Sequence, residues 1–192
     1  MPRLFTGIEI GADMRALLGG LKSPLPGASW VDSRNLHITL RFAGDVDNPT
    51  AREFADQLSM IDVPCFSIRL NGLGVFGKID PHTIWAGVEA GPELERLARA
   101  NERAARLAGL KPETRAFHPH VTLARLKHTR DEAVARLLGR HAAFRSPEIL
   151  VSRFVLYSSK PSIGGGPYVA EETFLLAGGG YDEDSGNGYG LW

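Results

Sequence analysis

The chain has 192 residues, enough for one well-buried domain or for two small lobes that share a core. The chain has 43% apolar and 23% charged residues, which is ordinary for a globular protein, so we do not expect a mainly disordered chain. The 22 basic residues balance the 22 acidic ones, which argues against a protein that coats nucleic acid but allows one that binds a single phosphate. The one cysteine, Cys65, cannot form an internal disulfide, and no stretch has the length of a membrane span, so we expect a cytoplasmic protein.

Apolar spacing and turn residues in the first half of the chain predict three strands that alternate with two helices. The strands are marked by β-type apolar runs, the helices by apolar residues at helical spacing, and glycine or proline closes each helix. The expected elements are a strand over residues 3–10, a helix that ends at Gly19 and Gly20, a strand over 36–42, a helix over 51–61 and a strand over 65–70.

The second half begins the same order again. Pro92 opens a long helix that Gly109 ends, and Thr129 with Glu132 forms a capping box for a further helix. The expected strands cover residues 83–89, 119–126, 148–157 and 168–176. We therefore predict an α+β fold with a repeated architecture in one domain, residues 1–176. Residues 177–192 are rich in glycine and aspartate without periodicity, so we expect a flexible tail.

One tetrapeptide, His-x-Thr-Leu, occurs twice in this pattern, beginning at His37 and again at His120. A chain of this composition with six histidines would contain about 0.03 copies of this motif by chance, so coincidence is a poor explanation for two copies. Because side chains alternate along a strand, the histidine and the threonine of each copy point to one face and the aliphatic residues to the other. The two copies predict a surface that carries two imidazoles with the hydroxyls of Thr39 and Thr122.

Two histidines on one surface suit acid–base chemistry without a cofactor. Imidazole titrates near pH ~6.5, so one member of the pair can accept a proton while the other donates one. Hydrolysis of a phosphodiester needs both, a base to activate water and an acid to protonate the leaving oxygen, and hydroxyls can hold the non-bridging oxygens. The alternative is two core strands whose histidines and threonines only satisfy internal hydrogen bonds.

The sequence also resembles the two-histidine phosphoesterase superfamily, and within it the bacterial and archaeal RNA 2',3'-cyclic phosphodiesterases, or 2'-5' RNA ligase-like proteins. The resemblance covers nearly all of residues 3–176. It is carried by Arg3-Leu4-Phe5, Trp30-Val31, the segments 35–44 and 119–125 around the two motifs, Gly74-Val75-Phe76-Gly77 followed by Trp85, and Gly166-Pro167-Tyr168. It implies a bilobal fold with pseudo-two-fold symmetry, in which two antiparallel sheets face a central groove and helices lie outside.

The resemblance further implies hydrolysis of a terminal 2',3'-cyclic phosphate on RNA to a 2'-phosphate, without metal or other cofactor. His37 would be the acid that protonates O3', His120 the base that activates water, and the two threonines would bind the phosphate. Further binding residues would be Arg125, Phe42 and His118. Strict alternation places Arg125 on the face opposite His120, so a phosphate contact requires a bulge. Phe42 could stack a nucleobase or pack in the core. His118 stands where the family often has arginine.

A metal site is the rival interpretation, because His118-Pro119-His120 is a His-x-His pair and His37 could be a third ligand. No acidic residue nearby is placed as a fourth ligand. A basic cluster favours an anionic ligand instead: Lys111, Arg115, Arg125, Lys127 and Arg130.

We thus expect a monomeric enzyme that acts on RNA 3' ends or oligonucleotides with a 2',3'-cyclic phosphate, with no obligate protein partner and no membrane. The alternatives are ligation or hydrolysis of a 2'-5' linkage, hydrolysis of a small cyclic nucleotide, and an RNA-end binding module without catalysis.

Overall fold

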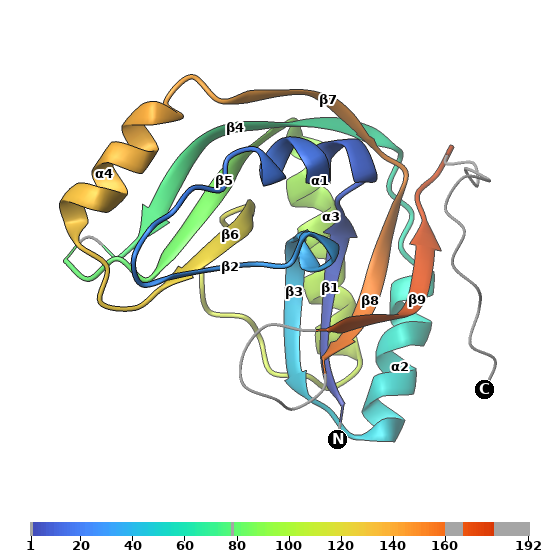
Figure 1. Cartoon of the computed structure of the whole chain (residues 1–192). Coiled ribbons are helices and arrows are strands. Elements are labelled where there is room, and N and C mark those ends of the chain that lie inside the picture. The colour runs from blue at the N-terminus through green and yellow to red at the C-terminus, as the bar shows by residue number, and fades with distance from the viewer. Residues whose placement is uncertain (1, 78, 160–166, 179–192) are drawn as a thin grey trace.

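The computed structural model describes residues 2–77, 79–159 and 167–178 (Figure 1). Gly166, which belongs to one segment of the family resemblance, and the predicted tail from position 179 onward lie outside these residues. None of the helices in the described ranges is long and apolar enough to cross a membrane.

All elements predicted for the first half are present, and β4 is longer than predicted. A short strand and a 3-10 turn also precede the first motif strand. In chain order the elements are β1 (Arg3–Glu9), α1 (Ala12–Gly19), β2 (Ala28–Trp30), η1 (Ser33–Asn35), β3 (His37–Asp45), α2 (Asn48–Ser59) and β4 (Phe66–Phe76). The extension of β4 includes the glycine-rich stretch, where the pairing with the next strand shifts between Leu70 and Leu73.

The second half also follows the predicted order, with one strand more than expected. Its elements are β5 (Thr83–Ala90), α3 (Pro92–Leu107), β6 (His120–Leu126), α4 (Asp131–Arg140), β7 (Arg145–Val151), β8 (Arg153–Ser159) and β9 (Tyr168–Leu175).

The strands form two antiparallel arms of one curved sheet. Their order is β7-β4-β5-β6-β3-β1-β8-β9, with β2 paired to β6. The arms meet between β6 and β3, where a single pair, Ile38 and Val121, is in register. Figure 1 shows α3 behind β1 and β3, and α4 outside the arm that contains β4 and β5. The α+β class and the two facing arms are confirmed, and the arms are joined through one residue pair instead of being separate sheets.

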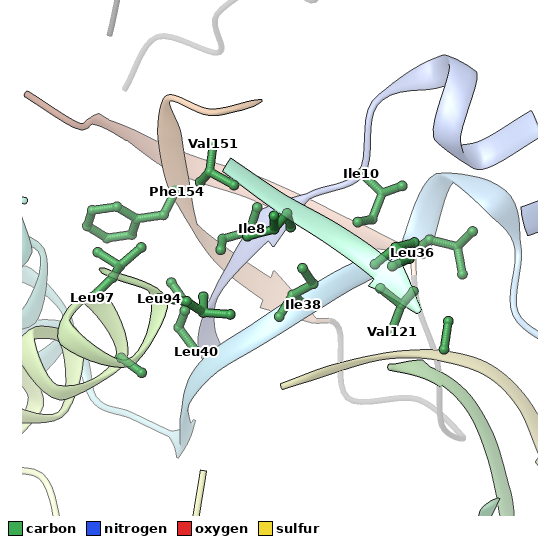
Figure 2. Packing of buried hydrophobic residues seen from close by; sticks show 14 of the residues in the cluster. Ile8, Ile10, Leu36, Ile38, Leu40, Leu94, Leu97, Val121, Val151 and Phe154 are labelled. Carbon is green, nitrogen blue, oxygen red and sulfur yellow. The ribbon is translucent and has the colours of Figure 1, made fainter. Parts of the chain in front are cut away.

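The core lies on the side of this junction away from the motif side chains. Ile38 and Val121 are both fully buried, and Figure 2 shows Leu94 of α3 beside Leu40 and Leu97 beside Phe154. Burying each such side chain contributes about 1.5–3 kcal/mol, so the junction between the arms is a stable part of the molecule. The apolar positions of the two motifs therefore anchor the strands that carry the histidines.

The predicted strand over 148–157 is wrong in one respect, because it is two strands that belong to different arms. β7 pairs with β4, and after Ser152 the chain enters β8, which pairs with β1 and β9. Apolar residues continue on both sides of Ser152, and Val151 and Phe154 are both buried. The apolar pattern therefore could not reveal the change of partner.

The predicted capping box is also wrong. Arg130 precedes the first turn of α4, and no side chain caps it. The hydroxyl of Thr129 is buried without a hydrogen-bond partner among the described residues, and it lies against the backbone of Gly27. The Lys127 amide donates to the Gly27 carbonyl at 2.8 Å, which holds the two segments together and turns Thr129 away from the helix.

Candidate active site

The junction of the two arms brings the two motifs together. Ile38 and Val121 point into the core, so their neighbours on each strand point to the opposite face, which forms the groove between the arms. These neighbours are His37, Thr39, His120 and Thr122. In an antiparallel pair, positions on either side of a paired residue lie opposite each other, so each histidine lies across from the threonine of the other motif.

Both histidines are oriented by the same backbone hydrogen bond. Nδ1 of His37 lies 2.7 Å from the carbonyl oxygen of Asn35, and Nδ1 of His120 lies 2.7 Å from that of His118. A carbonyl can only accept, so each Nδ1 carries a proton, and in the neutral ring Nε2 is the free base. Nε2 of His37 is also 3.1 Å from the hydroxyl oxygen of Thr39. The two motifs thus present the same nitrogen to the groove.

Burial decides the charge of both imidazoles. It lowers the pKa of His37 below its usual value; the bond to Asn35 opposes this, and the charges of His120 and Arg125 add to it. Burial also lowers the pKa of His120, which the charges of His118 and Arg125 lower further. Both rings are therefore neutral at pH 7 in the free protein, and a bound anion would raise both pKa values by favouring the imidazolium.

A bulge in β6 places Arg125 on the groove face. The pairing of β5 with β6 shifts by one position between Ile84 and Trp85, which inserts an extra residue into β6. Leu123 and Ala124 are consequently both buried, and Arg125 is exposed on the side of the histidine. The bulge that a phosphate contact by Arg125 requires is present.

The first motif strand has the same irregularity. The pairing of β1 with β3 shifts between Thr6 and Gly7, so Leu40 and Arg41 are both buried and Phe42 follows on the groove face. Phe42 is 42% exposed, which contradicts core packing as its role. Phe42 and Arg125 thus occupy equivalent positions in the two halves of the groove.

The remaining predicted residue, His118, lies at the edge of the second motif. Its ring centroid is 5.0 Å from that of Trp85 and 5.5 Å from that of Phe76, both in edge-on contact.

Nη1 of Arg125 donates to the hydroxyl of Thr83 at 3.2 Å, which fixes the guanidinium near the groove. All seven predicted site residues therefore lie on or beside the two motif strands.

Aromatic rings enclose both imidazoles and were not assigned to the site from sequence. Their centroids lie 4.8–6.2 Å from those of the histidines. Phe5, Tyr157 and Tyr168 surround His37, and Phe76 and Trp85 surround His120. They come from strands that only sheet pairing brings together. The available signal was their place in the segments that carry the family resemblance, which include four of these five rings.

The described residues contain no group of three histidine, cysteine, aspartate or glutamate side chains placed to hold a metal ion. His118 and His120 both pack against Trp85 and Phe76, and their ring centroids lie 6.0 Å apart. The rival metal site therefore has no ligand set among the described residues.

The surface of the protein has two hollows, one beside the groove and one on the other side of the sheet. One of about 380 Å³ opens beside the second motif, between Asn71, Trp85, Glu89 and His118. A larger one, of about 570 Å³, lies between α2 and α3. Because Arg41 contacts Glu102 of α3 from the core face of β3, this larger hollow is on the side of the sheet away from the histidines. The chemistry of the site therefore belongs to the open groove, not to the larger hollow.

Comparison with solved structures defines the class of the fold. The crystal structure of Escherichia coli LigT complexed with 3'-AMP matches with a TM-score of 0.74 and 25% identity, over 92% of this chain and 99% of that one. TT0787 of Thermus thermophilus matches with a TM-score of 0.72 and 25% identity, over 91% of this chain and 97% of that one. The chain has the LigT-type fold.

Sequence comparison places the chain more narrowly. A model of the 2'-5' RNA ligase superfamily matches residues 13–161, and the chain belongs to this family. A relative from Aquifex aeolicus, named RNA 2',3'-cyclic phosphodiesterase, is 34% identical over 155 residues, which are 78% of this chain and 82% of the relative. A relative of the same name from Aeropyrum pernix is 45% identical over 111 residues, which are 56% of this chain and 63% of the relative.

Proposed function

We propose that the protein hydrolyses a 2',3'-cyclic phosphate at the end of RNA to a 2'-phosphate, by acid–base catalysis with His37 and His120. One observation carries the proposal: both histidines bind a carbonyl through Nδ1 and present Nε2 to one groove. This is the arrangement needed for a proton acceptor and a proton donor on opposite sides of one phosphorus atom. The names of the Aquifex and Aeropyrum relatives support the same substrate.

In the proposed reaction the negative charge of the bound diester raises the pKa of His37, and the ring takes up a proton from solvent before the chemical step. Nε2 of His120 takes a proton from water as the water oxygen forms a bond to phosphorus. The bond from phosphorus to O3' breaks, and Nε2 of His37 gives its proton to O3'. The products are a 2'-phosphate and a free 3'-hydroxyl, and proton exchange with solvent returns the two histidines to their starting states. His37 takes the acid role because its motif has that place in the family resemblance.

The other groove residues would hold the substrate. The hydroxyls of Thr39 and Thr122 lie across from the histidines and suit the non-bridging oxygens, and Arg125 supplies positive charge beside the second motif. Phe42 is exposed for stacking with a base, and His118 lines the edge of the site.

Every group in this scheme comes from one chain, so we propose that the protein acts as a monomer, without metal or other cofactor. A cytoplasmic location is part of the same proposal, and the single cysteine, which cannot form an internal disulfide, supports it.

The test is incubation of the purified protein with a short RNA that ends in a 2',3'-cyclic phosphate, with EDTA present, resolving 2'- from 3'-phosphate products. We expect the 2'-phosphate, and we expect His141→Ala, a change at the distant end of α4, to leave the rate unchanged. Activity only after a divalent metal is added would refute the metal-free scheme. Binding of the RNA without turnover would favour the non-catalytic module, and turnover of only 2'-5'-linked RNA would favour the ligase alternative.

A further inference from the structure

The larger hollow, between α2 and α3, is bordered by a row of arginine side chains. Arg96, Arg99 and Arg103 line it, and their spacing of three and four residues places them on one face of α3. Arg99 pairs with Glu95 at 2.6 Å, whereas Arg96 and Arg103 are exposed and form no ion pair with another described residue. The only other charged residue in the lining is Asp62, so the α3 wall of the hollow keeps a positive charge.

Two strongly exposed apolar side chains border the same hollow. Met60, directly after α2, is 78% exposed, and Leu107, the last residue of α3, is 63% exposed. Apolar side chains left in water forgo the free energy of burial, so their place beside a hollow indicates a surface that binds another segment. A segment with carboxylates and aromatic rings would match this surface, because arginine pairs with carboxylates and stacks on aromatic rings.

The described part of the chain ends at the wall of this hollow. After β9, the amide of Ala177 donates to the carbonyl of Val63 at 2.9 Å, and the amide of Cys65 donates to the carbonyl of Ala177 at 3.0 Å. Val63 itself lines the hollow. Figure 1 shows β9, which leads to this point, beside α2. Residues 179–192 therefore begin at the edge of the hollow.

The sequence of residues 179–192 has the chemistry that the hollow requires. It contains three consecutive carboxylates, Asp182, Glu183 and Asp184, and no lysine or arginine. The whole chain has no net charge, so these three carboxylates balance three positive charges on the rest of the protein. The segment also carries three aromatic residues: Tyr181, Tyr189 and Trp192.

We propose that residues 179–192 dock in the larger hollow of the same molecule, with the carboxylates of 182–184 against Arg96 and Arg103 and the aromatic rings over Met60 and Leu107. The length of the segment permits this. At about 3.3 Å per residue Asp182 reaches up to ~13 Å from Gly178, and the whole segment reaches ~46 Å. The stretch of α3 from Pro92 to Leu107 that lines the hollow is about 22 Å long at ~1.5 Å per residue.

Tethering allows weak contacts to hold the segment. Exposed ion pairs contribute only about 0.2–1 kcal/mol each, but a short flexible tether gives an effective concentration in the millimolar range. The docked segment covers the exposed apolar side chains and neutralises the arginine row. The proposal does not depend on the proposed reaction, because the hollow lies on the side of the sheet away from the histidines.

The test uses the full chain with a nitroxide spin label on Ser185→Cys, directly after the acidic run, and Cys65→Ala so that only one site is labelled. A nitroxide broadens the amide NMR signals of residues near it. We expect the signals of Arg96 to Arg103 to lose most of their intensity. The tether alone broadens signals around Val63 in every variant, so the loss at α3 measures docking.

Charge reversal separates docking from tethering. Arg96→Glu with Arg103→Glu should restore the α3 signals, and lysine at all three positions of 182–184 in that variant should bring the loss back. The matched control is Arg136→Glu with Arg140→Glu, a reversal of two exposed arginines on α4, which should keep the loss seen in the parent. An α3 helix without intensity loss in the parent, or with the same loss after reversal of Arg96 and Arg103, would overturn the proposal.

Two further measurements identify another occupant of the hollow. In a mixture of spin-labelled protein with isotope-labelled protein that has no spin label, loss at α3 would show that the segment binds a second copy, which overturns docking within one molecule. If the spin label leaves α3 unaffected but a short single-stranded RNA shifts the α3 signals, the arginine row binds nucleic acid, and the proposal is likewise overturned.

Discussion

Gly7 lies against the first His-x-Thr motif, and its replacement by alanine tests how β1 positions His37. Gly7 is buried in β1 in register with Thr39. An added Cβ would lie 2.9 Å from the carbonyl oxygen of Ile38 and 3.4 Å from Cδ2 of His37. Ordinary contact begins at 3.4 Å, so the backbone at Ile38, which joins the two arms, must move by about 0.5 Å.

The expected cost follows from that displacement. Overpacking of a well-packed site destabilises by about 1–3 kcal/mol, and a catalytic group misplaced by about 1 Å loses about 100-fold in rate. We therefore expect Gly7→Ala to lower kcat by about 10-fold and to reduce the free energy of unfolding by about 1–3 kcal/mol. The assay is kcat on an RNA 2',3'-cyclic phosphate well below the melting temperature, together with denaturant unfolding.

The matched control is Gly139→Ala in α4, where an added Cβ meets no atom within 4 Å. Alanine is the better helix former by about 1 kcal/mol, so this variant should be slightly more stable with unchanged kcat. A Gly7→Ala protein with the parent's kcat and stability would refute the claim that the close fit of β1 and β3 positions the histidine.

Three further predictions concern the site and its support. Replacing His37 or His120 with alanine should lower kcat by about 10²–10⁴-fold with only a small change in melting temperature, and full activity in either variant would exclude the mechanism. Because the pKa values of both histidines are lowered in the free protein, the acid loses its proton below pH ~6.5, so the optimum of kcat/KM should lie below that pH. The optimum of kcat should lie higher, since the bound anion raises both pKa values, and coincident optima above pH ~7.5 would contradict this. Arg41→Leu leaves the partly buried carboxylate of Glu102 unpaired, so urea unfolding should show a loss of about 3 kcal/mol, whereas Arg99→Leu, which breaks an exposed pair, should cost under about 0.5 kcal/mol.

The features of the fold that follow local chemical rules were predictable from the sequence. Helical spacing closed by glycine or proline identified α1, α2 and α3, and alternation placed His37 with Thr39 and His120 with Thr122 on one face each. The same alternation showed that Arg125 could reach the groove only through a bulge, which the pairing with β5 supplies.

Features that depend on which strands pair were not predictable in this way. The change of arm at Ser152 leaves the apolar pattern uninterrupted, so one strand was predicted where β7 and β8 lie. Thr129 matches a capping box in sequence, but contact with Gly27 from a distant loop turns it away from α4. Phenylalanine is usually a core residue, and Phe42 is exposed only because of the bulge in β3.

The aromatic enclosure of the histidines belongs to the same category. Tyr157 and Tyr168 lie on β8 and β9, and they reach His37 because β8 pairs with β1. No spacing within the chain encodes that approach. The burial these rings provide is what lowers the pKa of His37, so part of the chemistry of the site comes from residues outside both motifs.

In the mechanism that we propose, His37 protonates the leaving O3' and His120 activates water. The most direct measurement uses an RNA 2',3'-cyclic phosphate in which the 3'-bridging oxygen is replaced by sulfur, because a thiolate leaves without needing a proton at neutral pH. We predict that this substrate restores His37→Ala to within about 10-fold of the parent rate and leaves His120→Ala inactive. Restoration of His120→Ala in place of His37→Ala would contradict the assignment, and restoration of neither would contradict acid catalysis by these histidines.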